Sequence, residues 1–258
     1  MDAPAVTLAG TEPALAEFSA KAARRAAAPA VPDWSLPARR PFWLPRRTAA
    51  FALTQFYQGE LATAEICAAL SLRLESPAAR AFLETQIADE RRHATFYRRY
   101  AELAGLELGD APALAEAYAA ARDWQGPPVA VVLAVHAVLE VENLRLQRTV
   151  ARWLPCPLLA DIGRVVAVDE ARHVAFGRLY APAALAELSP EDLRLARIWL
   201  ADLWASSADR IVGHFKGLRL LSRFYGVDDW RRTAWAEQRL ALADLGLAYA
   251  EDELETAA

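Results

Sequence analysis

A phrase of thirteen residues occurs twice in this chain, and its repetition constrains the fold more than any other feature of the sequence. Residues 88–100 read ADERRHATFYRRY and residues 168–180 read VDEARHVAFGRLY. Seven of the thirteen positions are identical at a separation of eighty residues, and each copy holds one of the four histidines of the chain. We therefore expect two similar segments in equivalent surroundings.

The residues around both copies predict long α-helices. Ala, Leu, Arg and Glu dominate from residue 48 onward, and almost no segment shows the alternation of a strand. Prolines at positions 77, 128, 157 and 190 each stand where a helix would begin. We predict an all-α chain with helices at 11–27, 48–74, 77–105, 111–123, 128–154, 157–183, 190–224 and 227–248.

Each copy of the phrase places a glutamate three residues before a histidine. In a helix this spacing puts Glu90 and His93 on one face, a turn apart, and it does the same for Glu170 and His173. One such pair is weak evidence for a site, because charged residues on a helix are usually only solvated. Two pairs in the same surroundings are much harder to explain in that way.

A further glutamate stands thirty residues before each pair, at Glu60 and Glu140. Thirty residues lead from the middle of one long helix, around a loop, to the middle of the next, so antiparallel neighbours would bring these side chains level in a bundle core. Four uncompensated carboxylates would be too costly to bury, and two divalent cations would offset their charge. Carboxylate oxygens with imidazole suit iron or manganese, whereas the lack of thiolate ligands argues against structural zinc.

The set fits the known template of di-iron and di-manganese carboxylate bundles. That template takes one Glu from each of two helices and a Glu-x-x-His from each of two others. The predicted metal ligands are Glu60, Glu90, His93, Glu140, Glu170 and His173.

An aspartate precedes the ligand glutamate in both copies and points about 100° away around the helix. Because a metal-bound histidine usually donates its other ring N–H to a carboxylate, we expect Asp169 to orient His93 and Asp89 to orient His173 across a pseudo-two-fold axis. The arginine three residues after each aspartate either braces it or forms an ordinary surface salt bridge; these arginines are Arg92 and Arg172.

The chain resembles the ferritin-like di-iron carboxylate superfamily. The resemblance rests on QFYQGE (55–60), ADERRH (88–93), VLEVEN (138–143) and VDEARHVAFG (168–177), and it covers about residues 48–183. Within the superfamily the chain is more similar to the oxygen-activating branch, namely the ribonucleotide reductase small subunit, its ligand-binding oxidase relatives and the aminobenzoate N-oxygenase type. The resemblance implies a ferritin-like four-helix bundle with additional C-terminal helices. It also implies that the six ligands hold two iron ions, or a mixed Fe/Mn pair, with dioxygen as co-substrate.

Two more residues are candidates for catalysis. Tyr97 stands four residues after His93, where the reductase small subunit places its radical tyrosine, and the second copy has Gly177 at this position. Tyr97 is either a packing aromatic or a redox-active residue. His136 lies four residues before Glu140 and is an extra ligand, a proton relay or a core histidine with satisfied hydrogen bonds.

The expected function is that of a non-haem di-iron oxygenase or oxidase acting on a small organic substrate. Hydroxylation, N-oxygenation, desaturation and C–C cleavage all remain open, and the resemblance implies an external ferredoxin-type electron donor. One alternative is a ferritin-like iron-handling protein without an organic substrate. Another is a metal-free helical scaffold.

Composition excludes several other classes. The net charge is -4 and no basic stripe with interleaved aromatics is present, so we expect no nucleic-acid partner. The longest apolar run, 129–141, is too short to span a bilayer, and the first residues do not read as a signal peptide. Cys67 and Cys156 are expected to be free thiols. A cytoplasmic homodimer is the resulting expectation.

The proline-rich segment 28–47 divides the chain. It holds five prolines and should form an extended connector, which Trp34, Phe42 and Trp43 would pin against the body of the protein. We expect residues 1–47 to form an N-terminal helix with this connector, and residues 48–250 to form one helical domain. Within that domain the metal-binding bundle is expected at 48–183 and the additional helices at 190–248.

Overall fold

The computed structural model describes residues 7–216 and 227–249, and every regular element in these residues is a helix. The all-α prediction is therefore confirmed. The helices are α1 (Leu8–Ala26), α2 (Arg46–Ser71), α3 (Pro77–Ala104), α4 (Pro112–Arg122), α5 (Pro128–Leu133), the π-helix η1 (Ala134–Leu139), α6 (Glu140–Trp153), α7 (Pro157–Ala186), α8 (Pro190–Lys216) and α10 (Val227–Asp244).

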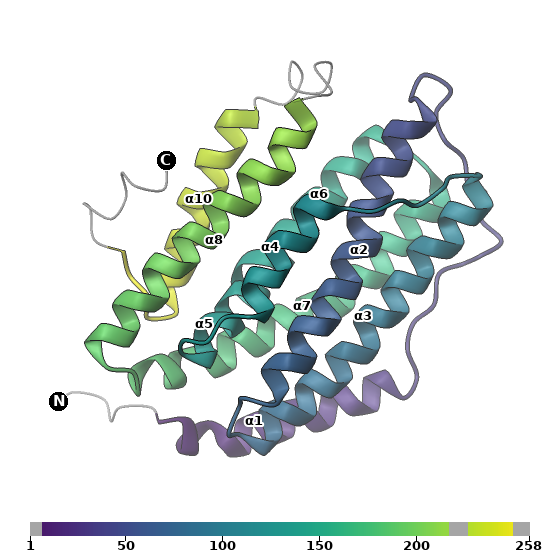
Figure 1. The fold of residues 1–258 in the computed structure, drawn as a ribbon. Helices are drawn as coiled ribbons and strands as arrows, with labels where there is room; N and C mark the ends of the chain where they lie inside the picture. The colour runs from purple at the N-terminus through teal and green to yellow at the C-terminus, as the bar shows by residue number, and fades with distance from the viewer. Residues whose placement is uncertain (1–6, 217–226, 250–258) are drawn as a thin grey trace.

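Four long helical columns form the bundle that positions the candidate site (Figure 1). They are α2, α3, the continuous column α5–η1–α6, and α7. The packing partners along the bundle are α2 with α3, α3 with α7, and α7 with both α5 and α6. At 1.5 Å per residue the 28 residues of α3 extend for about 40 Å, which leaves room for a site far from both ends.

The predicted start and stop signals act where the sequence placed them. Ser76 caps α3 by accepting a hydrogen bond from the backbone N–H of Ala79, and Pro77 is the first residue of that helix. Gly105 ends α3 in the left-handed conformation with φ of 63°, which a residue without Cβ adopts at little cost. Together these residues fix the length of the helix that carries the first repeated phrase.

The column that was predicted as one α-helix over 128–154 contains a π-helical segment, so that prediction was wrong in detail. Ala134–Leu139 forms η1, with the wider i→i+5 turn, between α5 and α6. Its sequence, AVHAVL, is apolar apart from His136, and the column is buried on all sides here. A segment that is apolar all round carries no periodicity from which the width of the turn could be predicted.

The helices outside the bundle cover its flanks. The α4 helix packs against α2 and α8, while α10 packs against α8 and η1. Stacked tryptophans, Trp124 with Trp199 and Trp204 with Trp235, join these elements. Gln238 on α10 donates a hydrogen bond from Nε2 to the backbone carbonyl of Val138 in η1 at 3.3 Å. The additional C-terminal helices therefore support the π-helical segment directly. In the part of the chain that is described, no helix is both long and apolar enough to cross a membrane.

The α1 helix crosses the bundle and packs against α3 and α7 (Figure 1). Leu15 is fully buried within the same core cluster as Phe82 of α3. The Glu12 carboxylate accepts hydrogen bonds from Ser76 Oγ at 2.6 Å and from the backbone N–H of Ala78 at 3.0 Å, next to the positive end of α3. The α1 helix thus stabilises both the side and the N-terminus of α3.

The connector after α1 is held by Trp34, one of the three aromatic residues that were expected to pin it, whereas Trp43 is 50% exposed. Trp34 packs edge-on against Phe96, with ring centroids 5.9 Å apart, and the Arg99 guanidinium lies over its ring. Phe42 is 95% exposed, so the expectation was wrong for this residue. The separation of residues 1–47 from a domain at 48–250 stays a prediction.

Replacing Leu15 with Ala tests whether α1 belongs to the cooperative folding unit. Because Leu15 is fully buried, we expect the free energy of unfolding to fall by about 2–5 kcal/mol in one transition, measured by chemical denaturation. Lys21→Ala, at an exposed position of the same helix, should change it little. A stability loss restricted to a separate early transition would show that α1 folds apart from the bundle.

Candidate metal centre

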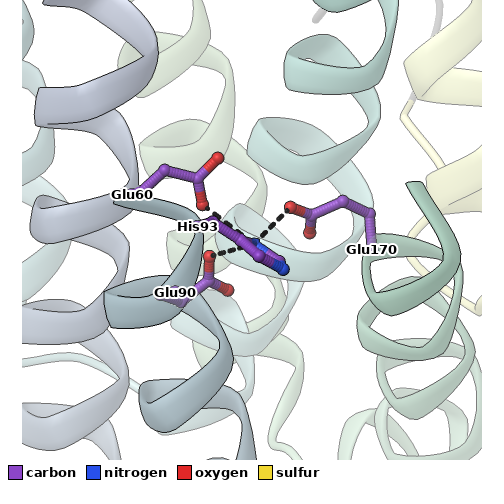
Figure 2. A group of neighbouring side chains, drawn as sticks. All are labelled: Glu60, Glu90, His93 and Glu170. Atoms are coloured by element: carbon purple, nitrogen blue, oxygen red, sulfur yellow. Dashed lines mark hydrogen bonds and ion pairs between the residues drawn. The ribbon is translucent and has the colours of Figure 1, made fainter. Parts of the chain in front are cut away.

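The six side chains that were predicted as metal ligands come together in the centre of the bundle. They form two overlapping groups of potential ligand atoms, and the atoms of each group lie within 4.8 Å of one another. One group is Glu60, Glu90, His93 and Glu170, and the other is Glu90, Glu140, Glu170 and His173. Figure 2 shows the first group, with the side chains converging on one another from α2, α3 and α7.

The spacing of the repeat explains this convergence. Glu60 lies on α2, Glu90 and His93 on α3, Glu140 is the first residue of α6, and Glu170 and His173 lie on α7. Each side chain is at most 3% exposed. Glu90 and Glu170 belong to both groups, so the two groups share a pair of carboxylates, one from each repeated phrase.

Both histidines direct Nδ1 into the carboxylates. His93 Nδ1 lies 3.3 Å from Glu60 Oε2 and 3.4 Å from Glu170 Oε1. His173 Nδ1 lies 2.9 Å from Glu170 Oε2 and 3.2 Å from Glu90 Oε1. The Nδ1 atoms are therefore the ring nitrogens that could bind metal, and Nε2 of each ring faces outward.

Each outward nitrogen faces an aspartate of the other repeated phrase. His93 Nε2 lies 3.3 Å from Asp169 Oδ2, and His173 Nε2 lies 3.5 Å from Asp89 Oδ2. The structure thus brings together the pairs that the sequence predicted across the pseudo-two-fold axis. A carboxylate in this position accepts the N–H and leaves Nδ1 free to act as a ligand.

The two arginines close a ring of ion pairs with these aspartates. Arg92 donates to Asp89 Oδ1 at 2.7 Å and to Asp169 Oδ2 at 2.6 Å. Arg172 donates to Asp169 Oδ1 at 2.9 Å and also to Asp89. Burial alone would disfavour the charged carboxyl, but hydrogen bonding to His93 and the attraction of Arg172 hold the pKa of Asp169 below its usual range. Of the two interpretations of the arginines, the contacts favour bracing of the aspartates.

The buried acids of the site outnumber the positive groups beside them, and burial and this imbalance shift the pKa values of both. Burial raises the pKa values of Glu60 and Glu140 well above the usual range. Burial also disfavours the charged imidazoles, yet the surrounding carboxylates raise the pKa values of His93 and His173 well above normal. Without metal these groups therefore hold their protons more tightly than the same side chains in water.

The residues present fit a pair of divalent metal ions. Glu60 Oε1, Glu90 Oε2 and Glu170 Oε1 are buried and have no hydrogen-bond partner among the described residues. Buried carboxylate oxygens without partners are costly, and metal coordination would satisfy them. Carboxylate oxygen with imidazole nitrogen is a donor set that iron and manganese accept.

The two candidate catalytic residues lie on opposite sides of the site. Tyr97 is buried, stacks on Phe56 with ring centroids 5.3 Å apart, and its hydroxyl has no hydrogen-bond partner in the described part of the chain. His136 is in neither group of potential ligands. Its Nε2 lies 2.8 Å from Gln86 Oε1 and its Nδ1 lies 2.8 Å from the carbonyl oxygen of Val132.

Sequence reasoning missed Gln86. Its amide nitrogen donates to Glu90 Oε1 at 3.0 Å and to Glu140 Oε1 at 3.1 Å, and the side chain is fully buried. The available signal was its position four residues before Glu90, on the same helix face. His136 lies four residues before Glu140 in the same way, and a histidine is a stronger signal than a glutamine because the chain has only four of them.

Replacing Asp169 with Asn tests the orientation of His93. The amide can present either an oxygen or an N–H to His93 Nε2 and lacks the charge that favours the required tautomer. We expect metal affinity to fall about 10–100-fold, measured by titration with Mn²⁺. Asp161→Asn on the same helix, where the carboxylate is near the surface and pairs with Arg164, is the control. Unchanged affinity in Asp169→Asn would remove this role.

Metal binding should release protons. The pKa values of both histidines, and of Glu60 and Glu140, are raised, so these groups hold protons more tightly than usual and must lose them to coordinate metal. The apparent affinity should therefore rise with pH as these groups deprotonate and fall as pH decreases. Calorimetry in buffers with different protonation enthalpies measures the number released. A binding enthalpy that is independent of the buffer would contradict this expectation.

Comparison with known proteins places the fold. No family model and no curated protein matches the chain. A variant of an R2-like ligand-binding oxidase with an aerobically reconstituted Mn/Fe cofactor is 18% identical, with a TM-score of 0.62 over 87% of this chain and 90% of that one. Another variant, with an anaerobically reconstituted Mn/Fe cofactor, is 19% identical, with a TM-score of 0.60 over 91% and 93%. The ferritin-like bundle with additional C-terminal helices is thus confirmed, and this chain has the fold of the R2-like ligand-binding oxidases.

Proposed function

We propose that the protein is a non-haem dimetal oxidase or oxygenase that uses dioxygen to oxidise a small organic substrate. The observation that carries this proposal is the pair of buried ligand groups that share Glu90 and Glu170. Shared carboxylates would hold two metal ions side by side, and this arrangement suits a reaction that needs more than one electron at one place. The fold of the R2-like ligand-binding oxidases supports the same function.

The six ligands divide between the two metal ions by group. Glu60 and His93 would hold one ion, Glu140 and His173 the other, and Glu90 and Glu170, which belong to both groups, would contribute to holding both. When bound, the metal pair would supply the redox chemistry that reduces dioxygen. Two iron ions or a mixed Fe/Mn pair both fit the donor set, and the Mn/Fe cofactor of the similar structures supports the mixed pair.

The surrounding residues hold the ligands and exclude water. Asp89 and Asp169 accept the outward N–H groups of the histidines and so keep Nδ1 directed inward. Aromatic rings flank both histidines. The ring centroids of Phe96 and His93 are 6.3 Å apart, and those of Phe82 and His173 are 6.2 Å apart. An apolar surrounding of this kind suits an organic substrate better than a mineral core.

Two residues are proposed to act in the reaction beyond metal binding. Burial and the negative charges of Glu60, Glu170 and Glu90 raise the pKa of Tyr97 well above normal, so its hydroxyl keeps its proton, and we propose a redox role for this residue. His136 reaches the ligands through Gln86 and is proposed as a proton relay. An external ferredoxin-type donor would supply electrons, and a cytoplasmic homodimer is the proposed state of the protein.

Metal analysis combined with oxygen reactivity tests the function. We expect about two metal ions per chain and, on mixing anaerobically reduced protein with dioxygen, a rapid absorbance change with stoichiometric oxygen consumption. Glu170→Ala removes a carboxylate shared by both groups and should abolish both results. Electron paramagnetic resonance of wild type and Tyr97→Phe would show whether a tyrosyl radical forms at Tyr97.

Two outcomes would contradict the proposal. A load of many iron ions per chain, with oxygen consumed in proportion to added iron and no response to organic compounds, would favour an iron-handling protein. A chain that binds no metal at all, although it folds normally, would favour a helical scaffold.

A further inference from the structure

The two halves of the site differ at three linked positions. The register of the repeat is eighty residues, so each residue of one half has an equivalent in the other. The metal ligands match between the halves, but three positions near them hold a polar or small residue in one half and an apolar or aromatic residue in the other. The equivalent pairs are Gln86 with Val166, His136 with Phe56, and Gly177 with Tyr97.

In one half a buried amide joins two ligands from different helices. Gln86 Nε2 donates to Glu90 Oε1 at 3.0 Å and to Glu140 Oε1 at 3.1 Å, so it links α3 to the start of α6. Its Oε1 lies 2.8 Å from His136 Nε2. Gln86 is fully buried and His136 is 1% exposed, so water does not compete for these contacts.

The carboxylates determine which way this amide points. When both acids are ionised to bind metal, an amide oxygen facing Glu90 and Glu140 would be repelled, whereas the NH₂ group can donate to both. Oε1 of Gln86 then faces His136, and Nε2 of that ring is the nitrogen that would donate to it. Burial lowers the pKa of His136 to about 4, so the neutral ring has one hydrogen to give. That hydrogen can serve Gln86 Oε1 from Nε2 or the carbonyl oxygen of Val132 from Nδ1, each 2.8 Å away, but not both. The first choice keeps the amide NH₂ group on Glu90 and Glu140, so the geometry points to it.

The fold makes room for His136 through Gly177 and the π-helical segment. A Cβ atom at position 177 would lie 2.5 Å from His136 Cβ, closer than such atoms approach, so glycine is required there. His136 itself lies within η1, in which the wider turn carries it against α7.

The other half lacks this unit. Phe56 occupies the position equivalent to His136. Tyr97, which is equivalent to Gly177, stacks on Phe56. Val166 replaces the amide and can donate no hydrogen bond. In agreement with this, Glu60 Oε1 has no hydrogen-bond partner among the described residues, while Glu140 Oε1 accepts from Gln86.

We propose that Gln86 and His136 act as a positioning unit that makes the two metal positions unequal. The unit holds Glu140 and stabilises its charge, so the position formed with His173 is the more polar and more strongly organised one. Among the described residues, the position formed with Glu60 and His93 has no amide equivalent to Gln86, because Val166 stands there. This inference rests on the proposed function only in requiring that both groups bind metal.

The test is titration of metal-free protein with Mn²⁺, followed through the resonance of the free ion. Gln86→Val introduces the residue of the other half and should weaken binding about 10–100-fold at the position formed with Glu140 and His173. The loss at the other position should be smaller, since only Glu90 links it to Gln86. Two backgrounds assign the position. In Glu60→Ala the remaining ion should lose this affinity on adding Gln86→Val, whereas in Glu140→Ala the second change should have a much smaller effect. Equal losses in both backgrounds, or no loss in either, would overturn the proposal.

Substitutions of His136 separate positioning from packing. His136→Gln keeps an N–H donor for Gln86 Oε1 and should retain most of the affinity, whereas His136→Phe, the residue of the other half, should lose it. Val166→Ala is the matched control at the position equivalent to Gln86 and should leave the ratio of the two affinities unchanged. Thermal unfolding of each metal-free variant reports stability separately. If affinity followed the unfolding temperature and not the presence of a donor, the role would be structural only.

Failure of this inference differs from failure of the proposed function. Wild-type protein that binds two Mn²⁺ ions but does not react with dioxygen after loading with iron would overturn the function and leave the inference in force. Protein that reacts with dioxygen but shows the same Mn²⁺ affinities with and without Gln86→Val would overturn the inference alone.

Discussion

The burial of four glutamates in the centre of a helical bundle is the constraint on which the rest of the structure depends. Each carboxylate is at most 3% exposed, and several of their oxygens have no partner among the described residues. A core that was selected for stability alone would exclude such groups, because removing charges from water costs more than their mutual contacts return. Two imidazoles and a ring of two aspartates and two arginines offset part of this cost. The remainder points to bound cations, so the metal pair and the fold are coupled.

The symmetric part of this arrangement, the six ligands and the two aspartates, could be predicted because their separations along the chain match the geometry of α-helices. A separation of three residues places Glu90 and His93 on one face, and a separation of thirty carries the chain from Glu60 to Glu90 on the neighbouring helix. The pairing of Asp169 with His93 followed from the same geometry, since a side chain about 100° from the ligand face reaches an adjacent helix. The helix starts at Pro77, Pro128, Pro157 and Pro190 could be predicted equally well, because capping residues and prolines act within one turn. In contrast, α2 begins at Arg46 and not at 48, and α7 continues past 183 to Ala186.

The parts that could not be predicted depend on contacts between distant segments. The π-helical turn lies in a segment without polar periodicity, and it is supported by Gln238 about a hundred residues later in the chain. The docking of α1 depends on Glu12 meeting the N-terminus of α3 across 66 residues. Gln86 could not be distinguished from an ordinary polar residue of a helix, because its role depends on the hydrogen bond to Glu140, 54 residues away on another helix. No local pattern encodes such pairs.

The three differences between the halves form one unit, since none would work alone. His136 with a side chain at position 177 would clash, because even a Cβ atom there would lie 2.5 Å away. Gln86 without His136 would have a buried carbonyl oxygen with no donor, and His136 without Gln86 would leave Nε2 facing an apolar residue. Conversely, the stacking of Tyr97 on Phe56 needs both rings. A repeat that is symmetric in its ligands and jointly altered in their supports is what a site needs if its two metal ions are to share carboxylates and still behave differently.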